Sequence, residues 1–381
     1  MAATPSSIDL DRSQRFEFVD ALRGLAALMV LSFHLMFNSA QTELLQSSAP
    51  KAFVELSRYG ANGVPIFFVI SGFVICYSVR RLPLTFAGAG NFALRRQVRL
   101  DPPYYVVIVG VLIIAAAESQ VAGLEARSFT IGQVLLNMVY LQDIVGVPAM
   151  VAVAWTLCIE VQFYLVLIVV MLATRRWRTS PSTQGGAVRL VVMILAALSL
   201  LMPWLGWSTG PWFMGHWWMF ALGMSVAWVL LREISMTTGW ALLAVTFVNC
   251  LAFNLNSPDS LGGYWAAWLT AVVLLLTVRT GAITSKMPRP LLLLGAWTYS
   301  LYLVHLLVID VLMGAMFKIT GQSIAGAWLA YGAGIVGSLV AAWVLYTLVE
   351  RRSVVWAQKL KPSYVREHGA RPPAPVTEQA P

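Results

Sequence analysis

Hydrophobic residues occur along the chain in long runs that short polar stretches separate. A helix that crosses a bilayer needs about 20 apolar residues, and ten runs reach or approach this length. They cover residues 18–38, 60–79, 104–119, 155–174, 188–206, 211–231, 239–256, 263–279, 291–313 and 325–349. The pattern predicts an all-α, polytopic integral membrane protein with about ten transmembrane helices.

Composition supports this fold class. Of the 381 residues, 59% are hydrophobic and 11% are charged, whereas soluble domains carry about 25% charged residues. Residues 1–17 lack the order of a cleaved signal peptide, so the first run is expected to remain as a helix. The three cysteines all lie in apolar runs, which favours buried thiols over disulfides or a metal site; they are Cys76, Cys158 and Cys250.

The net charge of +9 is concentrated in alternate connections between the runs. Arginine and lysine gather in residues 80–103, in residues 175–189, at 232, at 286 and 289, and after residue 350. The connections between these hold only Lys51, Arg58, Arg127 and Lys318. Because basic loops stay in the cytoplasm, we expect both termini to be cytoplasmic and the protein to lie in the inner or plasma membrane. The charge is thus explained without a nucleic-acid partner.

Three parts of the chain can be distinguished. Residues 1–17 are expected to form a cytoplasmic segment and residues 18–352 a single membrane domain. Residues 353–381 are expected to form a cytoplasmic tail, disordered from Pro362 because proline, alanine and glutamate dominate there. The connections 39–59 and 120–154 should face outward, and the second is apolar enough to pack back against the bundle.

The first hydrophobic run contains Arg23 and His34, which are eleven residues apart. At about 100° per residue, this spacing returns to within about 20° of the same helix face. Ionisable residues inside a membrane usually face a protein interior or a cavity. The alternative is an arginine that extends to the membrane surface and a histidine that merely packs between helices.

Arg96 and Arg99 lie one helical turn apart just before the third run. Such a pair could hold phosphates by bidentate hydrogen bonds, or could simply determine topology or contact lipid head groups. In the second run, Ser71 and Gly72 permit close approach of a ligand or of a neighbouring helix. For each pair of residues, the sequence alone leaves both the ligand-binding role and the structural role open.

Glu160 and three histidines share one layer of the expected bundle. By the predicted topology, His34, His216 and His305 all lie in the middle or outer part of their runs, at a depth similar to that of Glu160. A carboxylate beside an imidazole is a reasonable pairing in low dielectric, although a purely structural pair would look the same.

Taken together, these residues resemble the integral-membrane acyltransferase-3 family. The resemblance covers about residues 18–352. It is carried by Arg23 and His34 with ten residues between them, FFxxSGF at 67–73, RxxRLxPxY at 96–104, WTLxxExxFY at 155–164, YSLYLxH at 299–305 and YxxxE at 346–350. The chain departs from the family pattern at Pro65, Thr156 and Arg352.

The resemblance implies an acyl-CoA-dependent O-acyltransferase. It would move an acyl group, expected to be acetyl, from cytoplasmic acyl-CoA to a hydroxyl of a carbohydrate or glycolipid, such as an exopolysaccharide or a lipid-linked sugar. Acylation of an antibiotic or other secondary-metabolite sugar is the alternative within the family. Neither a permanently bound cofactor nor a metal is expected, and the oligomeric state is left open.

The roles expected on this basis follow the predicted depth of each residue. Arg23, Arg96 and Arg99 would hold the phosphates of CoA, and Ser71 and Gly72 would line the path of its pantetheine arm. His34 would be the general base, with Glu160 orienting either it or the acceptor. Contacts to the oxyanion or the acceptor are expected from Tyr164, His216 and His305.

Two other classes of protein compete with this interpretation. A transporter or flippase of a polar lipid would also place charges inside the membrane, but its expected inverted repeats and broken helices are not evident. A scaffold for other membrane enzymes would leave the buried polar layer unexplained.

Overall fold

The computed structural model describes residues 16–80, 82, 85–120, 127–175, 181–207, 210–256 and 262–360. Within these ranges the chain is helical and contains no strand. The described residues include 10 helical segments that are long and apolar enough to cross a membrane, so the predicted fold class and the predicted count are confirmed. The predicted N-terminal segment as far as residue 15 and the tail from residue 361 lie outside the described residues.

Each spanning segment is built mainly on one long helix. These helices are α1 (Glu17–Phe37), α4 (Gly63–Val79), α5 (Phe86–Glu118), α8 (Ala154–Thr174), α9 (Pro181–Leu201), α10 (Trp217–Leu230), α11 (Met236–Asn256), α12 (Gly262–Thr280), α13 (Arg289–Thr320) and α14 (Ile324–Leu345). Shorter helices connect or extend them: α2 (Thr42–Ser48), α3 (Lys51–Arg58), α6 (Ile131–Met138), α7 (Gln142–Val145) and α15 (Arg351–Lys359).

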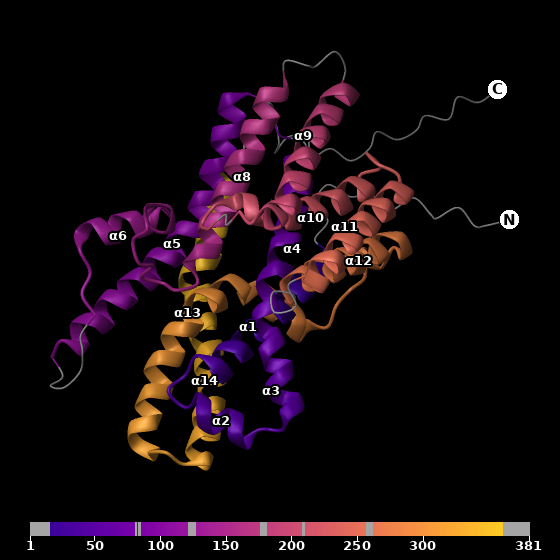
Figure 1. Cartoon of the computed structure of the whole chain (residues 1–381). Helices are drawn as coiled ribbons and strands as arrows, with labels where there is room; N and C mark the ends of the chain where they lie inside the picture. The colour runs from indigo at the N-terminus through magenta and orange to yellow at the C-terminus, as the bar shows by residue number, and fades with distance from the viewer. Residues whose placement is uncertain are drawn as a thin grey trace, which may run out of the picture.

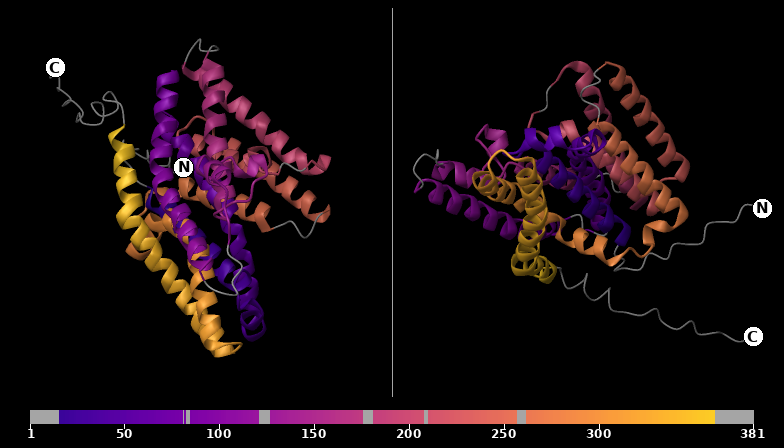
Figure 2. Two further views of the ribbon diagram at one scale, coloured as in Figure 1. Left: turned by 90° about the vertical axis from the view of Figure 1, so that its left-hand side faces the viewer. Right: turned by 90° about the horizontal axis from the view of Figure 1, so that it is seen from below.

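Helix α1 lies at the centre of the molecule, between two groups of helices (Figure 1). On one side it packs against α13, which pairs with α14. On the other side it packs against α4, which contacts α10 and α12. The buried hydrophobic side chains accordingly form two clusters, and α1 contributes to both. Figure 2 shows the α13–α14 pair from two further directions.

Two helix crossings in this arrangement have glycine on both sides. A Cβ atom on Gly72 of α4 would lie 2.0 Å from the carbonyl oxygen of Phe220, and one on Gly223 of α10 would lie 1.8 Å from that of Val69. The two backbones are therefore in direct contact, which only glycine allows. The second crossing pairs Gly24 of α1 with Gly295 of α13, where a Cβ atom on Gly295 would lie 2.3 Å from the carbonyl oxygen of Asp20.

Helix α5 begins much earlier than the sequence predicts. The prediction started this span at residue 104, after two prolines, whereas the helix runs through Pro102 and Pro103 from a cap at Thr85. Because Pro103 has no N–H group, it cannot pair with the carbonyl of Arg99 four residues earlier. Ser353 donates its hydroxyl hydrogen to that carbonyl instead, at 3.0 Å. A residue of a neighbouring helix therefore supplies the hydrogen bond that Pro103 cannot make.

Residues 353–359, which the sequence places at the start of the tail, form most of helix α15. This helix packs along the first half of α5, with Ser353 and Ala357 buried against it. The amide of Asn91 donates to the carbonyl of Leu360 at 2.8 Å. The packed helical structure therefore continues beyond residue 352.

Within the connection 120–154, the described residues from 127 pack back onto α5, as the sequence predicts. Tyr140 stacks on Tyr104 with ring centroids 5.0 Å apart. Its hydroxyl also donates to Asp101 at 2.9 Å.

Candidate active site

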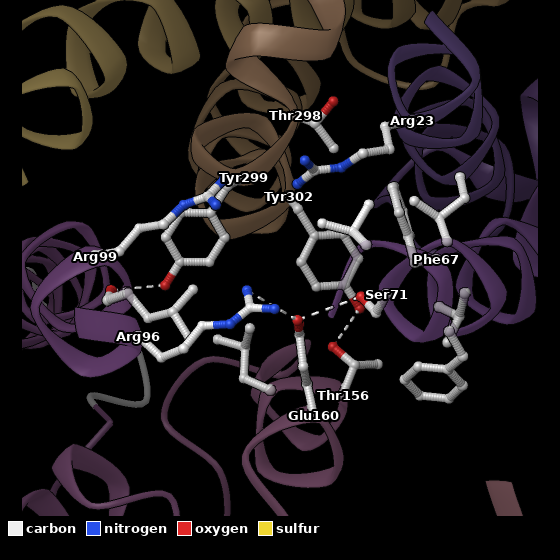
Figure 3. Close-up of a pocket in the computed structure, with 16 residues that line it drawn as sticks. Arg23, Phe67, Ser71, Arg96, Arg99, Thr156, Glu160, Thr298, Tyr299 and Tyr302 are labelled. Carbon is white, nitrogen blue, oxygen red and sulfur yellow. Dashed lines mark hydrogen bonds and ion pairs between the residues drawn. The ribbon is translucent and has the colours of Figure 1, made fainter. Parts of the chain in front are cut away.

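A cavity of about 90 Å³ lies where α1, α4, α5, α8 and α13 meet (Figure 3). Half of the predicted site residues line it; these are Arg23, Ser71, Arg96, Arg99 and Glu160. The remaining walls are largely apolar or aromatic and include Phe67, Phe68, Leu100, Leu157, Tyr299 and Tyr302. Segments far apart in the sequence thus converge on one polar cavity inside the bundle.

Glu160 lies at the centre of the polar contacts in this cavity. The hydroxyl of Ser71 donates to Glu160 Oε1 at 3.3 Å, and Arg96 Nη1 lies 4.0 Å from the same oxygen. Only 22% of the Glu160 side chain and 14% of the Arg96 side chain are exposed, so the two opposite charges compensate each other in a poorly solvated place. Glu160 therefore pairs with Arg96 and Ser71, while the predicted contact with His34 is not seen.

The side chains that line the cavity include more cationic than anionic groups. Arg96 and Arg99 lie on the same face of α5 because they are three residues apart, and Arg23 reaches the cavity from α1 (Figure 3). Among the lining residues, three arginines face a single carboxylate, that of Glu160. Such a surface favours an anionic ligand.

A second carboxylate, which the sequence analysis did not single out, lies behind the arginines. Glu350 is 3% exposed and accepts hydrogen bonds from the N–H and the hydroxyl of Ser300, at 3.2 and 2.6 Å. It also interacts electrostatically with Arg99 and Arg23. The π-helical turn Tyr346–Glu350 places it there, and its place at the end of the YxxxE pattern was the available signal.

Two tyrosines of α13 form the wall opposite Glu160. Tyr299 donates its hydroxyl to the carbonyl of Leu100 at 2.7 Å. Tyr302 accepts from Thr156 at 2.9 Å and packs edge-on against Phe67. Neither tyrosine was among the predicted site residues, although Tyr302 is three residues before His305 and so shares its helix face.

His34 and His305 lie together, but outside this cavity. Their ring centroids are 5.1 Å apart, and His305 is 1% exposed. Tyr302 both lines the cavity and contacts the His305 ring, with centroids 5.9 Å apart. In this conformation the predicted path from the arginines to His34 therefore does not continue as part of the cavity.

The other three predicted site residues also lie outside the cavity. Gly72 faces the backbone of α10. Tyr164 donates to the side-chain oxygen of Gln97. His216 packs against Phe68, a lining residue, with ring centroids 5.2 Å apart.

The chain belongs to a family of membrane acyltransferases. The family described as "Acyltransferase domain" matches residues 16–347, which confirms the resemblance seen in the sequence motifs. The relatives include proteins that the chain matches over most of their length and one that it matches only in part.

Nodulation protein 10 of Rhizobium leguminosarum bv. viciae is 25% identical over 81% of this chain and 84% of the relative. Acyltransferase MdmB of Streptomyces mycarofaciens is 24% identical over 97% of this chain and 98% of the relative. Peptidoglycan O-acetyltransferase OatA of Listeria monocytogenes is 29% identical, but over 48% of this chain and 27% of the relative. No solved structure matches the chain.

Proposed function

We propose that this protein transfers an acyl group, expected to be acetyl, from cytoplasmic acyl-CoA to a hydroxyl group of a carbohydrate. The observation that carries this proposal is the cavity in which Arg23, Arg96 and Arg99 outnumber the one lining carboxylate. CoA carries several phosphate groups, and guanidinium groups bind phosphate with paired, charge-assisted hydrogen bonds.

A glycan or a lipid-linked sugar is the proposed acceptor. One relative is named as an O-acetyltransferase of peptidoglycan, which is a carbohydrate polymer built outside the cytoplasm. An acceptor of this kind would approach from the outer side of the bilayer, whereas acyl-CoA would approach from the cytoplasm. A cavity inside the helix bundle suits a reaction in which the two substrates arrive from opposite sides.

In the proposed reaction, His34 accepts the proton of the acceptor hydroxyl. The hydroxyl oxygen attacks the thioester carbonyl, an ester forms, and the C–S bond breaks to release CoA, which takes up the proton from His34. General-base help of this kind is worth about 10²–10⁴-fold in rate. Because Tyr302 lines the cavity and contacts the His305 ring, the proposed reaction requires the Tyr302 ring to move aside.

Glu160 receives a different role from the one that the sequence suggested. Its contacts are with Arg96 and Ser71, so we assign it to holding the Arg96 guanidinium beside the cavity. Ser71 remains within reach of a ligand in the cavity.

Replacing His34 with alanine tests the proposed reaction. We expect acyl transfer from radiolabelled acetyl-CoA, measured in membranes with equal amounts of protein, to fall at least about 10²-fold. His368→Ala, a histidine outside the described residues, is the control and should keep full activity. A well-expressed His34→Ala protein with normal transfer would contradict the mechanism, and a wild-type protein that moves lipid but never consumes acyl-CoA would indicate a transporter.

A further inference from the structure

The contact between His34 and His305 leaves two ring nitrogens without partners. His34 Nδ1 and His305 Nε2 are both buried, and neither has a hydrogen-bond partner among the described residues. A buried polar atom without a partner costs about 1–3 kcal/mol. Two such atoms on neighbouring rings, with centroids 5.1 Å apart, therefore call for a common explanation.

The backbone of α13 determines which His305 nitrogen carries the proton. His305 Nδ1 lies 3.0 Å from the carbonyl oxygen of Leu301, and a carbonyl can only accept a hydrogen bond. Nδ1 is therefore the N–H donor, and in the neutral ring Nε2 keeps its lone pair as an acceptor. His305 thus offers one buried acceptor beside His34.

His34 Nδ1 can serve as the matching donor, because a neutral imidazole carries its proton on one of its two nitrogens. The second torsion of a histidine side chain is broad, and His34 is only half-buried, so a turn of its ring can bring its Nδ1–H to hydrogen-bond distance from His305 Nε2. That bond fixes the proton of neutral His34 on Nδ1. In the observed conformation His34 also interacts with the side chain of Asn38. Turning the ring ends that contact and leaves Nε2 free to act as the base.

We propose that His305 is a positioning residue which accepts a hydrogen bond from His34 Nδ1 and so selects the tautomer in which His34 Nε2 takes the acceptor's proton. The proposal rests on the proposed function. An imidazole here does what a carboxylate does in a Ser–His–Asp triad, where the third group holds the catalytic ring in the correct tautomer. Glu160 is unavailable for this role because it is engaged with Arg96 and Ser71.

Two substitutions of His305 separate positioning from packing. His305→Gln keeps a side-chain oxygen near the place of Nε2, whereas His305→Phe keeps the bulk of the ring but has no acceptor. We expect His305→Phe to lower kcat about 10²-fold, within the range of general-base catalysis. The KM for acetyl-CoA should stay within about twofold, because His305 does not line the cavity that binds the phosphates. His305→Gln should recover most of the lost kcat.

The outcomes distinguish this proposal from the reaction on which it rests. Normal kcat in folded His305→Phe, together with an inactive His34→Ala protein, would overturn the positioning role while leaving His34 as the base. Equal losses in folded His305→Phe and His305→Gln would show a packing role and also overturn it. Normal activity in His34→Ala would overturn both proposals. Melting temperature in detergent, measured for every variant, shows which proteins are folded.

Discussion

Arg96 is the arginine that contacts the carboxylate of the cavity, at 4.0 Å from Glu160. If it binds a phosphate of the acyl donor, Arg96→Gln should raise the apparent KM for acetyl-CoA about tenfold or more, because a hydrogen bond to a charged group contributes about 1.5–3 kcal/mol. The apparent KM of Arg96→Lys should lie between those of the wild-type protein and Arg96→Gln, since lysine keeps the charge without the planar guanidinium group. Steady-state kinetics with purified protein measures both effects.

The exposed Arg351, in α15, provides the matched control. Arg351→Gln removes the same charge outside the cavity and should leave the KM unchanged. An unaltered KM for acetyl-CoA in Arg96→Gln would contradict the phosphate-binding role of this arginine.

Glu350 supports the same arginines from behind the cavity wall. Glu350→Ala removes the acceptor for the Ser300 hydroxyl and the nearby negative charge. Leaving buried polar groups without partners costs about 1–3 kcal/mol, so the melting temperature in detergent should fall. Glu43→Ala, at an exposed site in α2, should not change it, and equal melting temperatures for the two variants would show that the Ser300 contact contributes nothing.

Residue spacing predicts that Arg96 and Arg99 share a helix face, and both line the cavity, but spacing does not account for the rest of the arrangement. The helix period places Arg23 and His34 on one face, but eleven residues also separate them by about 16 Å along the axis. Of these two residues, only Arg23 lines the cavity. The contact of Glu160 with Arg96 joins α8 to α5, and no local pattern in either helix specifies that pairing.

At the scale of helices, the α4–α10 crossing depends on Gly72. A methyl group there would lie 2.0 Å from a backbone oxygen that cannot rotate away. Gly72→Ala should therefore lower stability by at least about 1–3 kcal/mol, the usual cost of overpacking. Gly314→Ala, in α13 where a Cβ meets nothing within 4 Å, should be harmless. Thermal melting in detergent compares the two.

The same variant tests the binding role that the sequence suggested for Gly72. Any Gly72→Ala protein that remains folded should keep a normal KM for acetyl-CoA, because this residue does not line the cavity. A normal melting temperature together with a raised KM for acetyl-CoA would support the binding role that the sequence suggested for Gly72.

Helix boundaries show the limit of hydrophobicity as a signal. The apolar part of α5 was recognised, but its first part is charged and contains two prolines that normally end a helix. The contact that compensates for Pro103 comes from Ser353, 250 positions further along the chain. No residue near the two prolines in the sequence indicates that this contact with Ser353 forms.

For the whole molecule, membrane hydropathy predicted ten spans, and the structure contains them within its described residues. The orientation of the bundle stays a prediction, and single cysteines can test it. The native thiols at positions 76, 158 and 250 are buried and should contribute little background. We expect Glu43→Cys to react with an impermeant maleimide on intact cells.

Lys359→Cys, in α15, should react only after the membrane is opened, because basic segments stay in the cytoplasm. Labelling of both cysteines from the same side would contradict the predicted orientation. Labelling of Lys359→Cys on intact cells, with Glu43→Cys protected, would show that the orientation is the reverse of the predicted one.

The walls of the cavity come from α1 near the start of the chain and from α13 near its end. During translation, the early helices enter the bilayer long before α13 has left the ribosome. A nascent or truncated chain that stops before Tyr302 therefore holds its arginines without the opposite wall. Such an intermediate has no enclosed place in which to bring two substrates together, so we expect the proposed reaction to begin only when insertion is nearly complete.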